Sequence, residues 1–272
     1  MENKLVDIER VVGEKNPALL KWAPKFLINY IKRIVHQDEI NEILQNFGHL
    51  EGHEFARAIV SHFELELSTR GLENVPKDGG YIFVANHPLG GMDALSLIDQ
   101  LYSVRKDLQF IANDILMHLR PLREFFVGVN KHGSNAQEGV KAINQAFADP
   151  HALFIFPAGL VSRKTRRQVR DLEWKKTFIT RAKKYNKPVV PVFIDGELSP
   201  FFYRLSNIRK YLGIKANLEM LYLADELFKQ KGKKIPIVFG KPIPSEKFDK
   251  TKTDKEWADW MKGQVYALAD EI

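Results

Sequence analysis

The residues best suited to chemistry in this chain are a histidine and a carboxylate that follow an apolar segment. Tyr81 to Ala85 lead into Asn86-His87-Pro-Leu-Gly90-Gly91-Met-Asp93. Imidazole titrates near neutral pH, and a neighbouring carboxylate can fix its tautomer and stabilise the imidazolium ion. His87 and Asp93 could therefore act as a general base and its orienting group. Taken alone, the same residues could also be a packed histidine and a helix N-cap.

The elements around this pair indicate how the chain would hold it. Residues 81–86 fit a short strand that is buried on both faces of a sheet. The Pro/Gly turn that follows cannot continue the strand, and Gly90 and Gly91 allow a ligand to approach the backbone closely. Helical spacing of apolar residues begins at Asp93. We therefore expect the pair at the carboxyl end of a core strand, where open α/β sheets place their sites.

A second apolar segment ends in a turn of the same kind. Residues 152–157 run into Phe156-Pro157-Ala158-Gly159, with Ser162 shortly after. A basic loop follows, without an acidic residue until Asp171: Arg163, Lys164, Arg166, Arg167 and Arg170. Arginine and lysine can clamp phosphate, and such a turn exposes backbone N–H groups. The loop could also be a solvated basic segment, but its place after a strand end favours one cleft shared with the His87 turn.

The order of strands and helices predicts the fold class. Strand patterns occur at 81–86, 108–113, 125–130, 152–157, 188–194 and 235–240, and helix patterns at about 93–104, 115–123, 135–148, 173–185, 216–230 and 254–270. This alternation predicts an α/β domain at 69–272 with a mostly parallel central sheet, covered by helices on both faces. Residues 1–68 are expected to form an N-terminal helical region, with helices at 38–45 and 54–67.

The bulk composition limits the class of protein. The chain has 272 residues, no cysteine and a net charge of +7. Disulfides and thiolate chemistry are therefore excluded, and the charge favours anionic partners such as lipid head groups or an acidic carrier. No apolar run reaches the roughly 20 residues that span a bilayer, and the N-terminus lacks a signal-peptide pattern. We expect a soluble or peripheral protein.

Two segments combine aromatic and basic residues. Pro17 to His36 includes Trp22 and Phe26 among lysines and arginines, and Pro24 should break or kink it. Pro200 to Gly213 has the same character. Each could lie in a membrane interface or could pack on the main domain. If both segments share one surface, they would form an interfacial platform.

Metal and nucleotide sites are disfavoured by the motifs. His49 and His53 are four residues apart, but no His-Glu-x-x-His motif is present, and Gly48 and Gly52 weaken the helix that such a site needs. No Gly-x-Gly-x-x-Gly motif or P-loop occurs. We therefore expect no metal and no cofactor.

Four blocks of the chain, taken together, resemble the glycerolphosphate/lysophosphatidate acyltransferase superfamily. That family carries Asn-His-x4-Asp after one strand and Phe-Pro-Glu-Gly-Thr-Arg-Ser after a later one, which correspond here to Asn86–Asp93 and Phe156–Ser162. Phe126-Val-Gly128-Val-Asn130 is similar to the block between them, and Lys187–Gly196 is similar to the fourth. The resemblance covers about residues 70–245.

The departures from this pattern indicate a branch of the superfamily. Five residues, not four, separate His87 from Asp93, Ala158 replaces the family's Glu, and Asn130 stands where many members have Arg. The Glu and Arg are associated with a glycerol-phosphate acceptor. This form is similar to the bacterial branch that carries the label hemolysin, which includes O-acyltransferases of ornithine- and glycine-type aminolipids.

The resemblance implies an O-acyltransferase with acyl-carrier protein or coenzyme A thioester as co-substrate and a lysolipid as acceptor. His87 is the expected base and Asp93 its orienter. The implied substrate-binding residues are Asn86, Gly90, Gly91, Gly128, Asn130, Phe156, Pro157, Ala158, Gly159, Ser162, Arg163, Lys164, Arg166 and Arg167. The resemblance also implies a cytoplasmic protein on the inner face of the cell membrane.

Three alternative functions remain from the sequence. One is acylation of lysophosphatidate in phospholipid synthesis. Another is a non-catalytic lipid-binding protein on the same scaffold, which would have little need for His87 and Asp93. The third is nucleic-acid binding by the basic loop, for which no recognised module is present.

Overall fold

A computed structural model of the chain describes residues 6–15, 21–113, 119–129, 136–165 and 168–272. The chain divides into two compact units. Unit 1 comprises Met1–Leu50 and Leu198–Lys231, and unit 2 comprises Glu51–Glu197 and Gly232–Ile272.

Unit 2 is built on a mostly parallel sheet, as the alternation of strands and helices predicts. Within the described residues the strand order is β1-β9-β8-β2-β5-β3-β4. Neighbouring strands are parallel except for β8 and β9, which are antiparallel. The strands are β1 (Glu66–Arg70), β2 (Tyr81–Ala85), β3 (Leu108–Asn113), β4 (Phe126–Val129), β5 (Ala152–Ile155), β8 (Val189–Ile194) and β9 (Lys234–Phe239).

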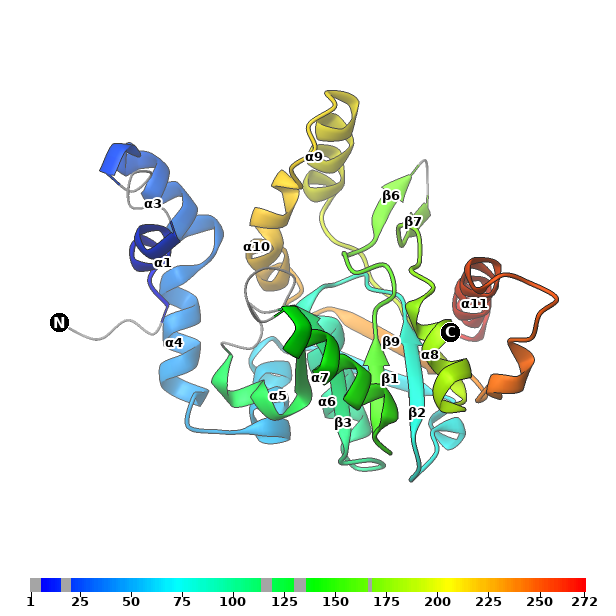
Figure 1. Ribbon diagram of the computed structural model, residues 1–272. Helices are drawn as coiled ribbons and strands as arrows, with labels where there is room; N and C mark the ends of the chain where they lie inside the picture. The colour runs from blue at the N-terminus through cyan, green and yellow to red at the C-terminus, as the bar shows by residue number, and fades with distance from the viewer. Residues whose placement is uncertain (1–5, 16–20, 114–118, 130–135, 166–167) are drawn as a thin grey trace. The chain divides into compact units, whose positions relative to one another are not determined.

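The core of unit 2 lies on both faces of this sheet. On one face Ile82 and Val84 join a buried apolar cluster with residues of α7 (Ala136–Ala148), α8 (Thr177–Tyr185) and α11 (Asp254–Ala267). On the other face the ring of Phe83 stacks on that of Phe154. Figure 1 shows α5 (Gly52–His62) and α6 (Gly91–Leu101) on the side of the sheet away from α8 and α11. Burial on both faces explains why the central strands are continuous apolar runs.

Short 3-10 helices and one hairpin complete unit 2. The 3-10 helices are η1 (Leu72–Asn74), η3 (Arg120–Phe125), η5 (Ser245–Lys247) and η6 (Leu268–Glu271). The hairpin pairs β6 (Arg163–Thr165) with β7 (Gln168–Arg170) in antiparallel register. The segment expected to be a basic loop is therefore part of a β-hairpin, because Arg163 pairs with Arg170 across the ladder.

Unit 1 is helical and joins two segments that lie far apart in the sequence. It contains α1 (Ile8–Lys15), α3 (Lys25–Ile34), α4 (Gln37–Phe47), α9 (Pro200–Tyr211), η4 (Leu218–Tyr222) and α10 (Leu223–Phe228). The imidazole of His36 stacks on the Phe228 ring at 4.2 Å between centroids, and its Nε2 lies 3.1 Å from Asp225 Oδ1. The hydroxyls of Tyr30 and Tyr222 are 2.6 Å apart.

Several expected elements differ from the structure. The helix expected at 54–67 ends at His62, because Glu64 adopts a left-handed φ of 51° and the chain then forms β1 at the sheet edge. Both α5 and β1 belong to unit 2, although α5 and the first three residues of β1 fall within the region 1–68. Of the helix expected at 115–123, residues 115–118 lie outside the described residues, and Arg120–Phe125 form a 3-10 helix.

In the second half of the chain, the segment 200–211 is a helix that the sequence pattern did not predict. Ser199 caps it by accepting a hydrogen bond from the Phe202 N–H, and Pro200 follows at the first helical position. The helix expected at 216–230 is divided into η4 and α10. Pro24 breaks the N-terminal segment, as expected: Lys21 and Trp22 are helical, Ala23 is a bend, and α3 begins directly after Pro24.

Candidate active site

His87 and Asp93 meet at the carboxyl end of β2. His87 lies two residues beyond the strand, and Asp93 lies in the first turn of α6. His87 Nδ1 and Asp93 Oδ2 are 2.8 Å apart. Since a carboxylate only accepts, this distance assigns the imidazole proton to Nδ1 and leaves the Nε2 lone pair available to a substrate. Gly90 makes the turn possible, with a left-handed φ of 70° directly before α6.

Burial dominates the electrostatics of Asp93. Its side chain is fully buried, and the Leu89 N–H donates to both carboxylate oxygens, at 3.3 and 3.1 Å. Burial raises the pKa of the Asp93 carboxyl above its ordinary value, while the hydrogen bond from His87 lowers it. Asp93 is thus held in one orientation, and its Oδ2 accepts from both the Leu89 N–H and His87 Nδ1.

The second turn lies against the first because β2 and β5 are neighbouring parallel strands. Val84 pairs with Ile155, so the carboxyl ends of the two strands meet at one edge of the sheet. The ring of Phe156 stacks on the His87 imidazole with centroids 4.2 Å apart. The Ser162 N–H donates to the His87 carbonyl at 2.7 Å. The two turns therefore form a single arrangement, as their positions after strand ends predict.

A buried carboxylate that the sequence analysis did not assign to the site, Asp171, ties these turns together. Its Oδ1 accepts from the His87 N–H at 3.1 Å and from Ser162 Oγ at 2.5 Å, and its Oδ2 accepts from Trp174 Nε1 at 2.8 Å. The Asp171 N–H donates to the Tyr266 hydroxyl at 2.7 Å. Its only sequence signal is its place as the first acidic residue after the basic run.

Asn86 is bonded within the sheet rather than turned toward a ligand. Its Nδ2 donates to the Ile194 carbonyl and its Oδ1 accepts from the Ile194 N–H, both at 2.7 Å. The side chain is buried and bridges the carboxyl ends of β2 and β8. Asn86 therefore fixes the point at which the chain leaves the sheet before His87.

Other expected substrate contacts are also turned inward. Ser162 is fully buried on Asp171, and Ala158 belongs to the apolar cluster that contains Trp174 and Phe178. Pro157 is buried beside it. A glutamate at position 158 would enter this apolar cluster, so the departure from the family pattern agrees with the packing.

The basic residues of the segment 163–167 that the structure describes differ in their burial and in their bonding partners. Arg163 is buried, and its Nη1 donates to the Val161 carbonyl at 2.5 Å. Lys164 Nζ lies 2.9 Å from Glu197 Oε2, with its side chain 35% exposed. Asn130, Arg166 and Arg167 lie outside the described residues.

The remaining glycines divide between the site and the sheet edge. Gly91 is the first residue of α6 and lies beside the His87 turn. Gly159 is exposed at a left-handed φ of 67°, and Lys175 Nζ lies near it. Gly128 lies on β4, three strands from β2 in the sheet order, which corresponds to about 14 Å at the usual strand spacing.

Comparison with known proteins decides the family. The family described as "Acyltransferase" matches residues 10–272. This chain belongs to that acyltransferase family. It is 43% identical over 267 residues to a lyso-glycine lipid O-acyltransferase of Bacteroides thetaiotaomicron, covering 97% of each chain. It is 41% identical to a protein of the same name from Phocaeicola vulgatus, covering 97% of this chain and 95% of the relative.

A solved structure is also similar. The crystal structure of the 1-acyl-sn-glycerophosphate (LPA) acyltransferase PlsC from Thermotoga maritima aligns with a TM-score of 0.49 and 19% identity. The alignment covers 90% of this chain and 92% of that one.

Within the described ranges of this acyltransferase, no group of three or more His, Cys, Asp or Glu side chains is placed to hold a metal ion. His53 stacks on the Tyr102 ring at 4.2 Å, and its Nε2 lies 4.0 Å from Asp99 Oδ1. Burial lowers the pKa of the His53 imidazole. His53 is therefore a packing residue in this structure.

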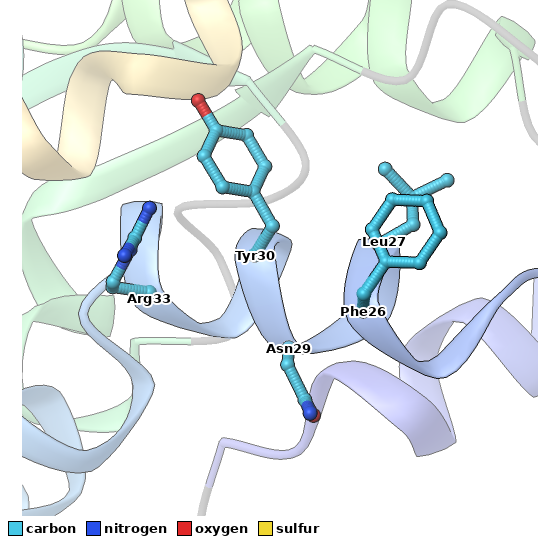
Figure 2. Close-up of a pocket in the computed structure, with 5 residues that line it drawn as sticks. All are labelled: Phe26, Leu27, Asn29, Tyr30 and Arg33. Atoms are coloured by element: carbon cyan, nitrogen blue, oxygen red, sulfur yellow. The ribbon is translucent and has the colours of Figure 1, made fainter.

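Unit 1 also has an apolar cavity beside α3. Its volume is about 540 Å³, and Figure 2 shows the α3 side chains that line it: Phe26, Leu27, Asn29, Tyr30 and Arg33. No helix among the residues described is both long enough and apolar enough to cross a bilayer.

Proposed function

We propose that this chain transfers a fatty acyl group from a thioester to the hydroxyl of a lyso-glycine lipid. The observation that carries the proposal is the His87–Asp93 hydrogen bond at the carboxyl end of β2, which is the arrangement that a general base requires. The choice of acceptor rests on the names of two relatives that align over nearly the full chain at 43% and 41% identity.

In the proposed reaction, the Nε2 atom of His87 takes the proton of the acceptor hydroxyl. The hydroxyl oxygen then attacks the thioester carbonyl, so that a C–O bond forms and the C–S bond breaks. The imidazolium ion returns its proton to the leaving thiolate, and Asp93 stabilises that ion while it exists. No enzyme nucleophile is needed, because the substrate supplies the oxygen.

The thioester oxygen requires hydrogen-bond donors as it becomes negative. The Gly159 N–H already donates to the Phe156 carbonyl at 2.9 Å. The first N–H groups of a helix have no carbonyl partner within it, so the Gly91 N–H at the start of α6 is the better candidate.

We assign the anionic part of a substrate, either a head group or the phosphopantetheine of the carrier, to the β6–β7 hairpin. Lys164 supports this assignment, since its side chain is partly exposed and an ammonium group can bind a phosphate or carboxylate. Either acyl-carrier protein or coenzyme A could supply such a thioester. We also propose a peripheral location on the inner face of the cell membrane, where these thioesters and a lysolipid meet.

Mass spectrometry of the products tests the proposal. Purified protein is incubated with acyl-carrier protein or coenzyme A thioester and with lyso-glycine lipid or lysophosphatidate. We expect diacylated glycine lipid, and its loss in His87→Ala. His151→Ala is the matched control, because His151 precedes β5 at the opposite end of the strand and lies 3.8 Å from Asp107. Turnover that survives in His87→Ala would contradict the mechanism, and thioester consumption only with lysophosphatidate would contradict the acceptor.

A further inference from the structure

Exposed apolar side chains concentrate in unit 1 of this acyltransferase. The segment from α9 to η4 exposes seven large apolar residues: Phe201, Ile208, Tyr211, Leu212, Ile214, Leu218 and Leu221. Tyr211 is 91% exposed and Leu212 is 62% exposed. Every residue from Tyr211 to Leu218 is exposed. We call residues 208–221 the apolar tip.

The inner side of the apolar tip is polar. Glu219 is fully buried and forms an ion pair with Arg209 at 2.8 Å. Ser206 is also buried, and its Oγ donates to Glu219 Oε1 at 3.4 Å. A helix in water normally turns its apolar side inward. Here the C-terminal half of α9 buries Ser206 and pairs Arg209 with a buried carboxylate, while Ile208 and Tyr211 are exposed beside Asn207 and Lys210. Exposed apolar side chains among polar ones suit a partner that is apolar beneath a polar surface.

The tip is held in this orientation by hydrogen bonds. Arg209 Nη1 donates to the Ile214 carbonyl at 2.8 Å, and the Ile214 N–H donates to the Arg209 carbonyl at 3.1 Å. At the other end of α9, Glu226 accepts from both the N–H and the Oγ of Ser199, at 2.5 Å. The apolar side chains therefore cannot turn inward without breaking a buried ion pair.

The charged residues around the apolar tip indicate the kind of surface that it could bind. Residues 200–218 contain four basic residues and no acidic one. Arg209 is paired with Glu219, and Arg204, Lys210 and Lys215 are exposed. Basic side chains beside inserted apolar residues match a surface that is anionic at its head groups and apolar beneath them. An acidic carrier protein would satisfy the charges but not this number of exposed apolar side chains.

A second segment of unit 1 also exposes large apolar side chains next to basic ones. Trp22 and Phe26 are 81% and 74% exposed next to Lys21 and Lys25. The hydrogen bond between Tyr30 and Tyr222 connects α3 with the end of η4. The two aromatic and basic segments that the sequence shows separately are thus parts of one unit.

We propose that the apolar tip inserts into the head-group region of an anionic lipid bilayer. This inference deepens the peripheral location proposed above and depends on it, but it does not depend on turnover. Tyr211 and Leu212 would enter the interface, while Lys210 and Lys215 contact lipid phosphates.

Vesicle co-sedimentation of the full chain tests this proposal. For vesicles of phosphatidylglycerol and phosphatidylcholine, Tyr211→Ser with Leu212→Ser should lower the partition coefficient by about 100-fold, or about tenfold per side chain. Lys210→Gln with Lys215→Gln should lower it by about 25-fold, with little change on phosphatidylcholine alone. The matched control is Val140→Ser with Leu172→Ser, two exposed apolar residues of unit 2 that should leave binding unchanged.

The outcomes separate the possible partners. His87→Ala protein should bind vesicles as the wild type does, so a failure of the proposed chemistry would not affect this result. Thermal unfolding checks that each variant is folded. Unchanged vesicle binding in the tip variants, or an equal loss in the unit 2 control, would overturn the proposal. The proposal would also be overturned if a tip variant bound vesicles as the wild type does but lost self-association or lost binding to acyl-carrier protein.

Discussion

Replacing Asp93 by asparagine should abolish most activity while the protein stays folded. Asp93 is fully buried and accepts from His87 Nδ1 at 2.8 Å and from the Leu89 N–H. In either orientation an asparagine removes the negative charge that stabilises the imidazolium ion. If its oxygen takes the place of Oδ1, it keeps the longer bond from Leu89 and its NH2 group faces Nδ1. His87 would then have to carry its proton on Nε2, which is the atom proposed to act as the base.

The size of this effect follows from the same geometry. In serine hydrolases, the equivalent change to the wrong tautomer lowers kcat about 10⁴-fold. Because Asp93 makes the same contact with Nδ1, we expect a loss of about 10³- to 10⁴-fold, or about 4–5.5 kcal/mol of transition-state stabilisation. Initial rates of thioester consumption with lyso-glycine lipid measure it. A loss of less than tenfold would refute the assignment of His87 as the base and Asp93 as its orienter.

The same substitution, Asp93→Asn, should leave the thermal stability of the protein equal or higher although it lowers the activity. Burial raises the pKa of Asp93, so the ionised carboxylate is disfavoured in the folded state. This carboxyl stabilises the fold below its unfolded pKa, and that contribution is lost as pH rises through its folded pKa. The Asp93→Asn protein should therefore have an equal or higher Tm than the wild type at neutral pH. The difference should shrink as pH falls toward 3.8, the ordinary value. A large drop in Tm at neutral pH would show that the loss of activity is structural.

Three further predictions concern the groups around the pair. Asp171→Asn should lower kcat about 10- to 100-fold with little change in KM, because the amide cannot accept from three donors as a carboxylate does; steady-state kinetics check this, and a change in KM alone would contradict it. Asn86→Asp should destabilise the fold by about 2–4 kcal/mol, since it removes the donor to the Ile194 carbonyl and buries a charge; denaturant unfolding measures it, and an unchanged midpoint would refute it. Phe156→Leu should lower kcat by less than tenfold, because the stack on His87 is lost while the bond to Asp93 remains; a loss as large as that of His87→Ala would show that Phe156 does more than pack.

The sequence predicted the parts of the fold that are fixed by local patterns. The six expected strands are present within a few residues, because central strands of a parallel sheet are continuous apolar runs. Strand β1 was not predicted. Its alternation of exposed and half-buried residues over Glu66–Arg70 is short, and its partner β9 lies far along the chain. The helix α9 was missed for a related reason, since its outward apolar face removes the usual amphipathic signal.

The site was predictable to the extent that it follows strand ends. His87, Asp93 and the Phe156 turn all lie at the same edge because β2 and β5 are parallel neighbours. Asp171 could not be found in this way. It reaches the site only because the β6–β7 hairpin brings the chain back, so its role depends on tertiary structure.

The side chain of Asn86 has a consequence for how the site is lost on heating or in denaturant. The Asn86 side chain donates one hydrogen bond and accepts another, as a peptide group does, so it continues the hydrogen bonding between β2 and β8 after the backbone has turned away. The His87 N–H is thereby released to Asp171. A turn joined to the central strands by such bonds opens only when those strands separate. The turn should therefore belong to the most slowly exchanging part of the protein, unlike the mobile loops that carry many binding sites.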